Sequence, residues 1–223
     1  MAWLKRIAAP KWWPIERKSH KFITTVRGPH SEAIPLQVLV RDIFKLADSA
    51  KEAKKIITSG NVLVDGKIRK DIKFGVGPMD IVNIPTLKKT WRAVPKDGLT
   101  FVETSGNDSK IKIVKIVDKT IIRGGKTQLN LDDGKNILTN EKYSTKDSLL
   151  IEIPTQKITD VVKFEQGNLA LVTSGKNKGV SAKIKEIDNE NKRVWLENGE
   201  ETFETPIANV LMIGKDKPMV KIE

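Results

Sequence analysis

The sequence predicts a multi-domain α+β protein, in which a small domain of two helices and a hairpin precedes two β domains. The chain has 223 residues, and with 39% hydrophobic and 5% aromatic residues it can form several small cores more readily than one large core. Residues 36–59 carry apolar side chains at helical spacing, whereas short alternating runs separated by glycine turns follow residue 95. We expect four segments: an arm (1–36), a helical domain (37–94), a central all-β domain (95–160) and a C-terminal β-barrel with its tail (161–223).

The arm is basic and interrupted by prolines. Prolines at positions 10, 14 and 29 exclude a long helix. Three tryptophans alternate with cations, and their rings must pack on the protein's own domains as a strap, on a partner protein or on RNA, where aromatic and arginine planes stack on unpaired bases. Because its charge and prolines argue against a self-contained fold, we expect the arm to be ordered only on RNA. Its candidate RNA-binding residues are Lys5, Arg6, Lys11, Trp12, Arg17, Lys18 and Lys21.

Residues 37–94 begin with two short helices that lead into a β-hairpin. Apolar residues recur at helical spacing over 36–47 and 50–57. Ser49 and Glu52 form a capping box at the start of the second helix, and Gly60 suits the left-handed residue that ends it. The pair Asp65-Gly66 suits a tight hairpin turn, and an alternating run over 80–84 predicts a strand that closes the domain.

The polar positions of these helices and of the hairpin carry cations, which would give a small apolar core a basic face. The glycine, alternating valines and Asp-Gly over 60–66 resemble the hairpin of the S4-type RNA-binding domain, a family in which two helices and such a hairpin grip RNA. The resemblance favours RNA binding over the alternative of an ordinary solvated basic face. The candidate RNA-binding residues are Arg41, Lys45, Lys51, Lys54, Lys55, Lys67, Arg69 and Lys70.

Residues 95–160 are predicted to be all β. Strand candidates lie at 101–104, 112–117, 120–123, 128–131, 136–139 and 148–153, with glycine-containing turns between them. Their spacing is typical of a small barrel or sandwich. The run from Gly124 to Thr127 imitates the end of a phosphate-binding loop, but position 120 is threonine and no helix follows, so we interpret the run as a turn between strands.

The C-terminal segment contains a glycine-bracketed basic loop between two strands. Gly175 and Gly179 flank Lys176, Asn177 and Lys178, the candidate residues for a second RNA contact. Such a loop presents cations and backbone N–H groups to phosphate. The stretch 166–187 resembles the KOW motif of SH3-like barrels. Ala182 departs from it, since many such sequences have glycine there, and this puts the tight packing of the returning strand in question. From the residues alone, a plain glycine-rich hairpin is at least as good an interpretation. Trp195 fits a core or platform position.

The charge of the chain favours a polyanionic partner. The net charge is +12 and the pI about 9.7, which suits nucleic acid or an anionic membrane surface. Residues 1–36 hold seven Lys/Arg and two acids, and residues 37–94 hold twelve and six. Residues 95–160 hold eleven and ten, and residues 161–223 hold ten of each. The first 94 residues should therefore supply most of the electrostatic attraction.

Several classes of protein are disfavoured by what the sequence lacks. It has no cysteine and two histidines, His20 and His30, so we expect no disulfide framework and no zinc site. No apolar run approaches eighteen residues, and the N-terminus lacks the apolar core of a signal peptide. We therefore expect a cytoplasmic protein without a membrane span.

Taken end to end, the chain resembles the ribosomal protein S4e family of the archaeal and eukaryotic small subunit. The order of motifs carries the resemblance: the start 4–11, Trp13-Pro14, 28–30, 64–69, 77–81, 128–134 and the KOW stretch. It implies a non-catalytic, ribosomal RNA-binding component of the ribonucleoprotein in the cytoplasm, acting in translation beside neighbouring small-subunit proteins, and a monomer when free. It implies neither metal nor cofactor.

Three alternatives stay open at this point. An RNA-modifying enzyme can carry an S4-type domain, but the 130 or so residues after 94 offer no paired carboxylates, activated nucleophile or metal constellation. A transcription or translation factor would use the C-terminal barrel to bind a protein partner without RNA. A membrane-surface protein would need a free basic amphipathic helix, and none is free of the predicted core.

Overall fold

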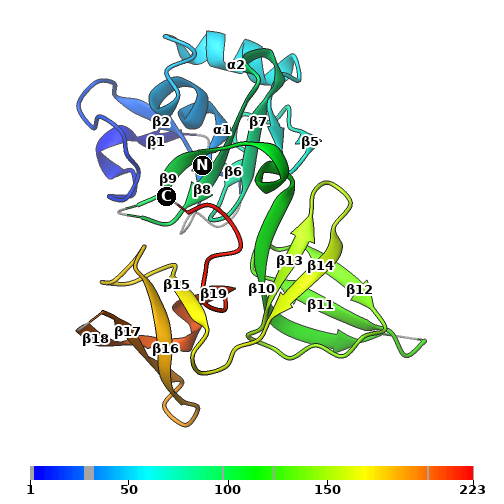
Figure 1. Ribbon diagram of the computed structural model, residues 1–223. Helices are drawn as coiled ribbons and strands as arrows, with labels where there is room; N and C mark the ends of the chain where they lie inside the picture. The colour runs from blue at the N-terminus through cyan, green and yellow to red at the C-terminus, as the bar shows by residue number, and fades with distance from the viewer. Residues whose placement is uncertain (1–2, 28–32, 97, 123, 200, 223) are drawn as a thin grey trace. The chain divides into compact units, whose positions relative to one another are not determined.

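The computed structural model describes residues 3–27, 33–96, 98–122, 124–199 and 201–222. The chain divides into two compact units, which we call unit 1 (Met1–Ser105) and unit 2 (Gly106–Glu223). Short helical segments and many strands in several sheets make up the fold (Figure 1). The α+β class is thus confirmed. The four predicted segments are a finer division than these two units, and their boundaries stay a prediction.

The N-terminal segment of unit 1 is bonded to the rest of the unit. Its strands β1 (Trp3–Lys5) and β2 (Phe22–Thr24) pair antiparallel, separated by a loop that starts with a 3-10 turn. Farther along, β3 (Ile34–Pro35) pairs with β6 (Gly75–Val76), and the Arg27 N–H donates to the Lys73 carbonyl at 2.9 Å. The Thr24 hydroxyl donates to the buried side chain of Gln37, whose amide donates to the Ala50 carbonyl at 2.8 Å.

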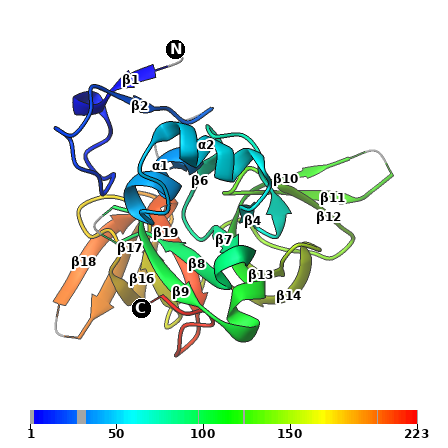
Figure 2. The ribbon, with the colours of Figure 1, turned by 90° about the horizontal axis from the view of Figure 1, so that it is seen from above.

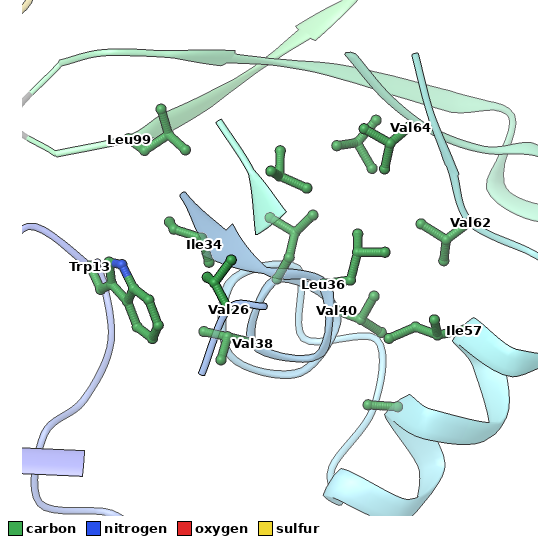
Figure 3. Packing of buried hydrophobic residues seen from close by; sticks show 14 of the residues in the cluster. Trp13, Val26, Ile34, Leu36, Val38, Val40, Ile57, Val62, Val64 and Leu99 are labelled. Atoms are coloured by element: carbon green, nitrogen blue, oxygen red, sulfur yellow. The ribbon is translucent and has the colours of Figure 1, made fainter. Parts of the chain in front are cut away.

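The same segment also completes the core of unit 1. Ala9, Trp13, Ile23 and Val26 belong to one buried cluster with the helices and sheet, and Trp13 is only 3% exposed. Figure 3 shows the Trp13 ring pointing toward Val26 and its neighbours in this core. The expectation that the arm is ordered only on RNA is therefore wrong for its described residues. Its tryptophans find their packing partners within the unit, as the strap alternative requires.

Two helices lie over the sheet of unit 1. The first consists of α1 (Leu36–Val38) followed by a π-helical turn, Leu39–Ile43, whose inner side chains are buried. It ends before the predicted residue 47, because Lys45 adopts a left-handed φ of 52° and the chain turns there. The second, α2 (Ala50–Thr58), starts with the predicted cap, in which the Ser49 hydroxyl accepts from the Glu52 N–H at 3.2 Å.

The main sheet of unit 1 has the order β5-β4-β7-β8-β9. The predicted hairpin joins β4 (Leu63–Val64) to β5 (Lys67–Ile68) through Asp65 and Gly66, both at positive φ. The other strands are β7 (Ile81–Ile84), β8 (Lys89–Val94) and β9 (Thr100–Thr104). The strand predicted at 101–104 for the central domain thus belongs to this first sheet, because β9 pairs with β8 along its length.

The first sheet of unit 2 has the order β12-β11-β10-β13-β14. Its central strand, β10 (Ile111–Ile121), replaces the two short strands predicted over 112–123. An irregularity between Ile116 and Asp118 divides it, so that its first half pairs with β13 (Ser148–Glu152) and its second half with β11 (Thr127–Leu131). The outer strands are β12 (Asn136–Thr139) and β14 (Lys157–Val162).

The second sheet of unit 2 has the order β18-β17-β16-β15-β19. Its members are β15 (Leu169–Val172), β16 (Ser181–Asp188), β17 (Arg193–Asn198), β18 (Glu201–Pro206) and β19 (Val210–Gly214). Inward residues of these strands form a separate buried cluster. The two strands predicted around the basic loop form as β15 and β16, while closure into an SH3-like barrel remains a prediction.

Two buried polar contacts join the sheets of unit 2. The Lys115 ammonium, on β10, donates to the Ile207 and Ala208 carbonyls at 2.7 and 3.0 Å. The Ser148 hydroxyl, on β13, accepts from the Met212 N–H at 3.1 Å. Burial of Lys115 lowers its pKa to about 8, against the opposing attraction of Asp132. Each bond satisfies a polar group that would otherwise be buried without a partner.

Candidate nucleic-acid interface

Helix α2 presents one apolar and one basic side. Ala53 and Ile57 are buried against the core, whereas Lys51, Lys54 and Lys55 are exposed. This division follows from the 3.6-residue period, because positions three and four apart share a face. The three predicted lysines therefore stand on the solvent side of a helix whose N-terminus is capped and whose inner side is held by packing.

The hairpin β4–β5 continues this basic surface at the end of α2. Gly60, at φ 86°, ends the helix, and a Cβ on it would lie 3.3 Å from an Ile68 methyl and 3.6 Å from the Lys70 stem. The close approach sets Ile68 and the exposed Lys70 beside the end of α2, while Lys67 is exposed next to the hairpin turn. We call Lys51, Lys54, Lys55, Lys67 and Lys70 the α2–hairpin surface.

Asp65 holds this hairpin in place. Its carboxylate accepts from the Ile81 N–H at 3.0 Å, and its own N–H donates to the Ile81 carbonyl at 2.8 Å. The side chain is buried, so the bond is protected from water. The sequence predicted Asp65 only as a turn residue, and the structure shows that it also anchors the hairpin to β7.

The predicted arginines contact the protein itself. Arg6 is 2% exposed, and its guanidinium donates to the Glu16 carbonyl and, at 2.7 Å, to Asp42. The second oxygen of Asp42 accepts from Arg41 at 2.8 Å. The prediction that Arg6 contacts RNA is corrected by this geometry, since its side chain is enclosed and ion-paired with a residue 36 positions away.

Two other predicted arginines are also engaged within unit 1. Arg17 donates to the Ile7, Ala9 and Pro10 carbonyls at 3.2, 2.9 and 2.8 Å, which fixes the loop between β1 and β2. The Arg69 guanidinium lies 4.4 Å from the centre of the Phe74 ring. The planar guanidinium group, with its fixed set of N–H donors, suits such contacts within the protein. Both residues keep part of their surface for an outside partner.

The remaining candidates of unit 1 differ in exposure. Trp12 is half-buried and meets Trp13 edge to face, with ring centres 6.1 Å apart. The other candidates are lysines with exposed side chains: Lys5, Lys11, Lys18, Lys21 and Lys45. Trp12 therefore keeps only part of its side chain exposed. The exposed cations of the N-terminal segment are carried on a fixed loop and not on a free tail.

In unit 2, the predicted loop joins β15 to β16. Gly175 and Gly179 take positive φ of 95° and 86°, and the Gly179 N–H donates to the Val172 carbonyl at 2.8 Å. Lys176 is exposed at the tip, while Asn177 and Lys178 are half-buried. The structure thus brings the three candidates together in one tight turn, in the form that the spacing of the glycines predicts.

Ala182, the departure from the usual motif, fits its place. It is buried on β16 directly opposite Ala170 on β15. Two small residues across one pair let the strands pack without a larger side chain. Trp195, on β17, is 40% exposed, so it is not a core residue.

The described ranges of the chain hold neither a metal-binding cluster nor a membrane-spanning helix. No group of three or more acidic or histidine side chains there could hold a metal ion, and His30 lies outside these residues. Within the same ranges, no helix has the length and apolar composition needed to cross a membrane. The ion pairs of Asp133 with Lys112 and Lys135, both at 3.0 Å, belong to the first sheet of unit 2.

Comparison with family models assigns most of the chain to known modules. Residues 3–33 match the RS4NT (NUC023) domain, 34–82 the S4 domain, 89–158 the ribosomal family S4e and 166–197 the KOW motif. The S4 match spans the helices and hairpin of the α2–hairpin surface, and the KOW match spans the loop at 173–180.

Similar proteins are found among ribosomal components of archaea. The small ribosomal subunit protein eS4 of Methanosphaera stadtmanae is 45% identical, over 98% of this chain and 95% of the relative. The protein of the same name from Archaeoglobus fulgidus is 43% identical, over 98% and 97%. A crystal structure of the 30S ribosomal protein S4e from Thermoplasma acidophilum superposes with a TM-score of 0.73 at 30% identity, covering 83% of this chain and 96% of the other.

Proposed function

Because this chain belongs to the ribosomal protein S4e family, we propose that it is a structural constituent of the small ribosomal subunit that binds ribosomal RNA. It is not an enzyme, as the family is one of structural ribosomal proteins. Its partners are the small-subunit RNA and the neighbouring ribosomal proteins. We further propose a cytoplasmic location in the ribosome, a monomeric free form, and function without membrane, metal or cofactor.

The exposed lysines of the α2–hairpin surface carry this proposal. A-form RNA hides its base edges in a deep major groove, so a protein that binds it meets phosphates and overall shape. Lysine is a flexible point charge suited to phosphate, and five of them stand on a capped helix and an anchored hairpin. Because the backbone under these lysines is already fixed, binding restricts little more than the lysine side chains themselves.

The proposed contacts fall into three groups. The α2–hairpin surface is the first, together with Lys45, the half-buried Arg69, and Arg41, which is 11% exposed beside Asp42. The N-terminal loop is the second, through Lys5, Lys11, Trp12, Arg17, Lys18 and Lys21. The third is the loop of unit 2, where Lys176, Asn177 and Lys178 accompany backbone N–H groups. Arg6 is left out of the proposal because its charge is buried and paired.

Charge reversal on α2 tests the first group. The double variant Lys54→Glu/Lys55→Glu should weaken binding to a small-subunit RNA transcript strongly and lower the slope of log K against log salt by about 1.5–2, since two phosphate contacts are lost. The matched control is Lys88→Glu/Lys89→Glu, which makes the same charge change at two exposed lysines of unit 1 outside the proposed contacts. Binding by the α2 variant within twofold of wild type, or equal losses in both variants, would reject the α2–hairpin surface.

A further inference from the structure

Phe22 is an aromatic residue that the fold leaves in solvent. It is 48% exposed on β2, although its neighbours Ile23 and Thr24 are buried. Its side chain shares a face with Lys5, which pairs with it directly across β1 and β2. The Lys21 ammonium lies 5.4 Å from the centre of its ring. The result is an exposed aromatic ring with one cation over it and a second on the neighbouring strand.

The charge around this ring indicates what could cover it. The exposed charged side chains on the loop between β1 and β2 are Lys11, Lys18, Lys21 and one acid, Glu16. An apolar protein surface would bring these lysines into a dry interface, which is costly unless acids pair with them. An unpaired nucleotide offers both complements at once, a π face for the ring and phosphates for the ammonium groups.

The ring is also held on a rigid support. The Arg6 N–H donates to the Lys21 carbonyl at 3.0 Å, and the Arg6 side chain is locked by Asp42. At the other end of β2, Thr24 is bonded to the buried Gln37. Figures 1 and 2 show β1 and β2 on the opposite side of α1 from the β4–β5 hairpin. Phe22 thus lies apart from the α2–hairpin surface and has a fixed backbone.

We propose that Phe22 is a stacking platform for an unpaired RNA base, with Lys5 and Lys21 contacting the flanking phosphates. This inference rests on the proposed RNA binding and adds a non-ionic contact to it. The sequence suggested that tryptophans of the arm stack on RNA bases, but Trp13 is buried in the core. The proposal assigns this stacking role to Phe22.

Substitutions of the ring separate stacking from charge. Phe22→Ala should lower affinity for the small-subunit RNA transcript by about 5- to 150-fold, the range for loss of one stacked base. Its salt slope should equal that of wild type, because no phosphate contact is removed. Phe22→Leu keeps an apolar side chain but has no ring, so it should lose most of the affinity that stacking contributes. Phe22→Tyr keeps the ring and should bind within twofold of wild type. Leu87→Ala, which truncates another exposed apolar side chain of unit 1, should have no effect.

The outcomes distinguish this inference from the proposed function. Wild type that fails to bind the RNA removes the proposed function and the platform with it. Wild type that binds, with Phe22→Ala or Phe22→Leu binding equally well, overturns the platform alone. A parallel loss in Phe22→Ala and Leu87→Ala, or a lowered salt slope in Phe22→Ala, overturns it as well. Ultraviolet crosslinking of wild-type protein should yield an RNA adduct on the peptide that contains Phe22, and its absence from otherwise crosslinked complexes contradicts the proposal.

Discussion

Truncation of Trp13 tests whether the N-terminal segment is part of the folded body in the absence of RNA. The ring is 3% exposed and packs in the same cluster as the helices. Removing a fully buried tryptophan costs about 3–5 kcal/mol, from lost burial and from the cavity left behind. With a urea m-value of about 2–3 kcal/mol/M, Trp13→Ala should lower the unfolding midpoint of unit 1 by about 1–2.5 M.

Tryptophan fluorescence during urea unfolding of the free protein is the appropriate assay. Four of the five tryptophans precede residue 105, so the signal comes mainly from unit 1. Ile7→Ala is the matched control, because Ile7 lies in the same segment with 76% of its surface exposed and should change the free energy of unfolding by under 0.5 kcal/mol. A Trp13→Ala effect as small as that of the control would refute the packing of this segment and restore RNA-dependent ordering.

Two further predictions concern buried charges. Asp42→Ala should destabilise unit 1 by about 3–5 kcal/mol in the same assay, because it leaves the enclosed Arg6 guanidinium without its counter-ion; a loss below about 1 kcal/mol would contradict the ion pair. For Lys115, burial lowers the pKa to about 8 from 10.5, so the unfolded chain binds more protons between those values. The difference in unfolding free energy between wild type and Lys115→Met should therefore shift in favour of wild type as the pH rises from 8 to 10.5. A flat difference over that range would show that the folded pKa of Lys115 is not depressed.

Local signals in the sequence predicted local structure well. The cap at Ser49, the helix end at Gly60, the turn at Asp65 and the glycine-bracketed loop around Lys176 all form as expected. Each depends on the conformational preference of a few adjacent residues, or on a short side-chain reach. The spacing of apolar residues likewise predicted which side of α2 is buried and where most strands of unit 2 lie.

Long-range pairing set the limit of prediction. Whether Arg6 faces RNA or the interior depends on Asp42, which no spacing rule connects to it. Likewise β9 joins the first sheet because β8 is available to it, and the arm folds because the helices offer Trp13 a place in the core. Charge counts could not separate arginines that build the fold from lysines that remain exposed. The residue type was the one signal that distinguishes the two groups, since arginine is favoured over lysine for buried and bidentate ion pairs.

Salt-dependent binding of the wild-type protein to small-subunit ribosomal RNA tests RNA binding most directly. With 6–10 phosphate contacts, affinity should fall by about 10³–10⁵ between 50 and 200 mM salt, and RNA crosslinked to the protein in cell extract should be small-subunit ribosomal RNA. An affinity that hardly changes with salt, or recovery of transfer RNA, messenger RNA or no RNA, would contradict a scaffold that grips ribosomal RNA through its exposed lysines.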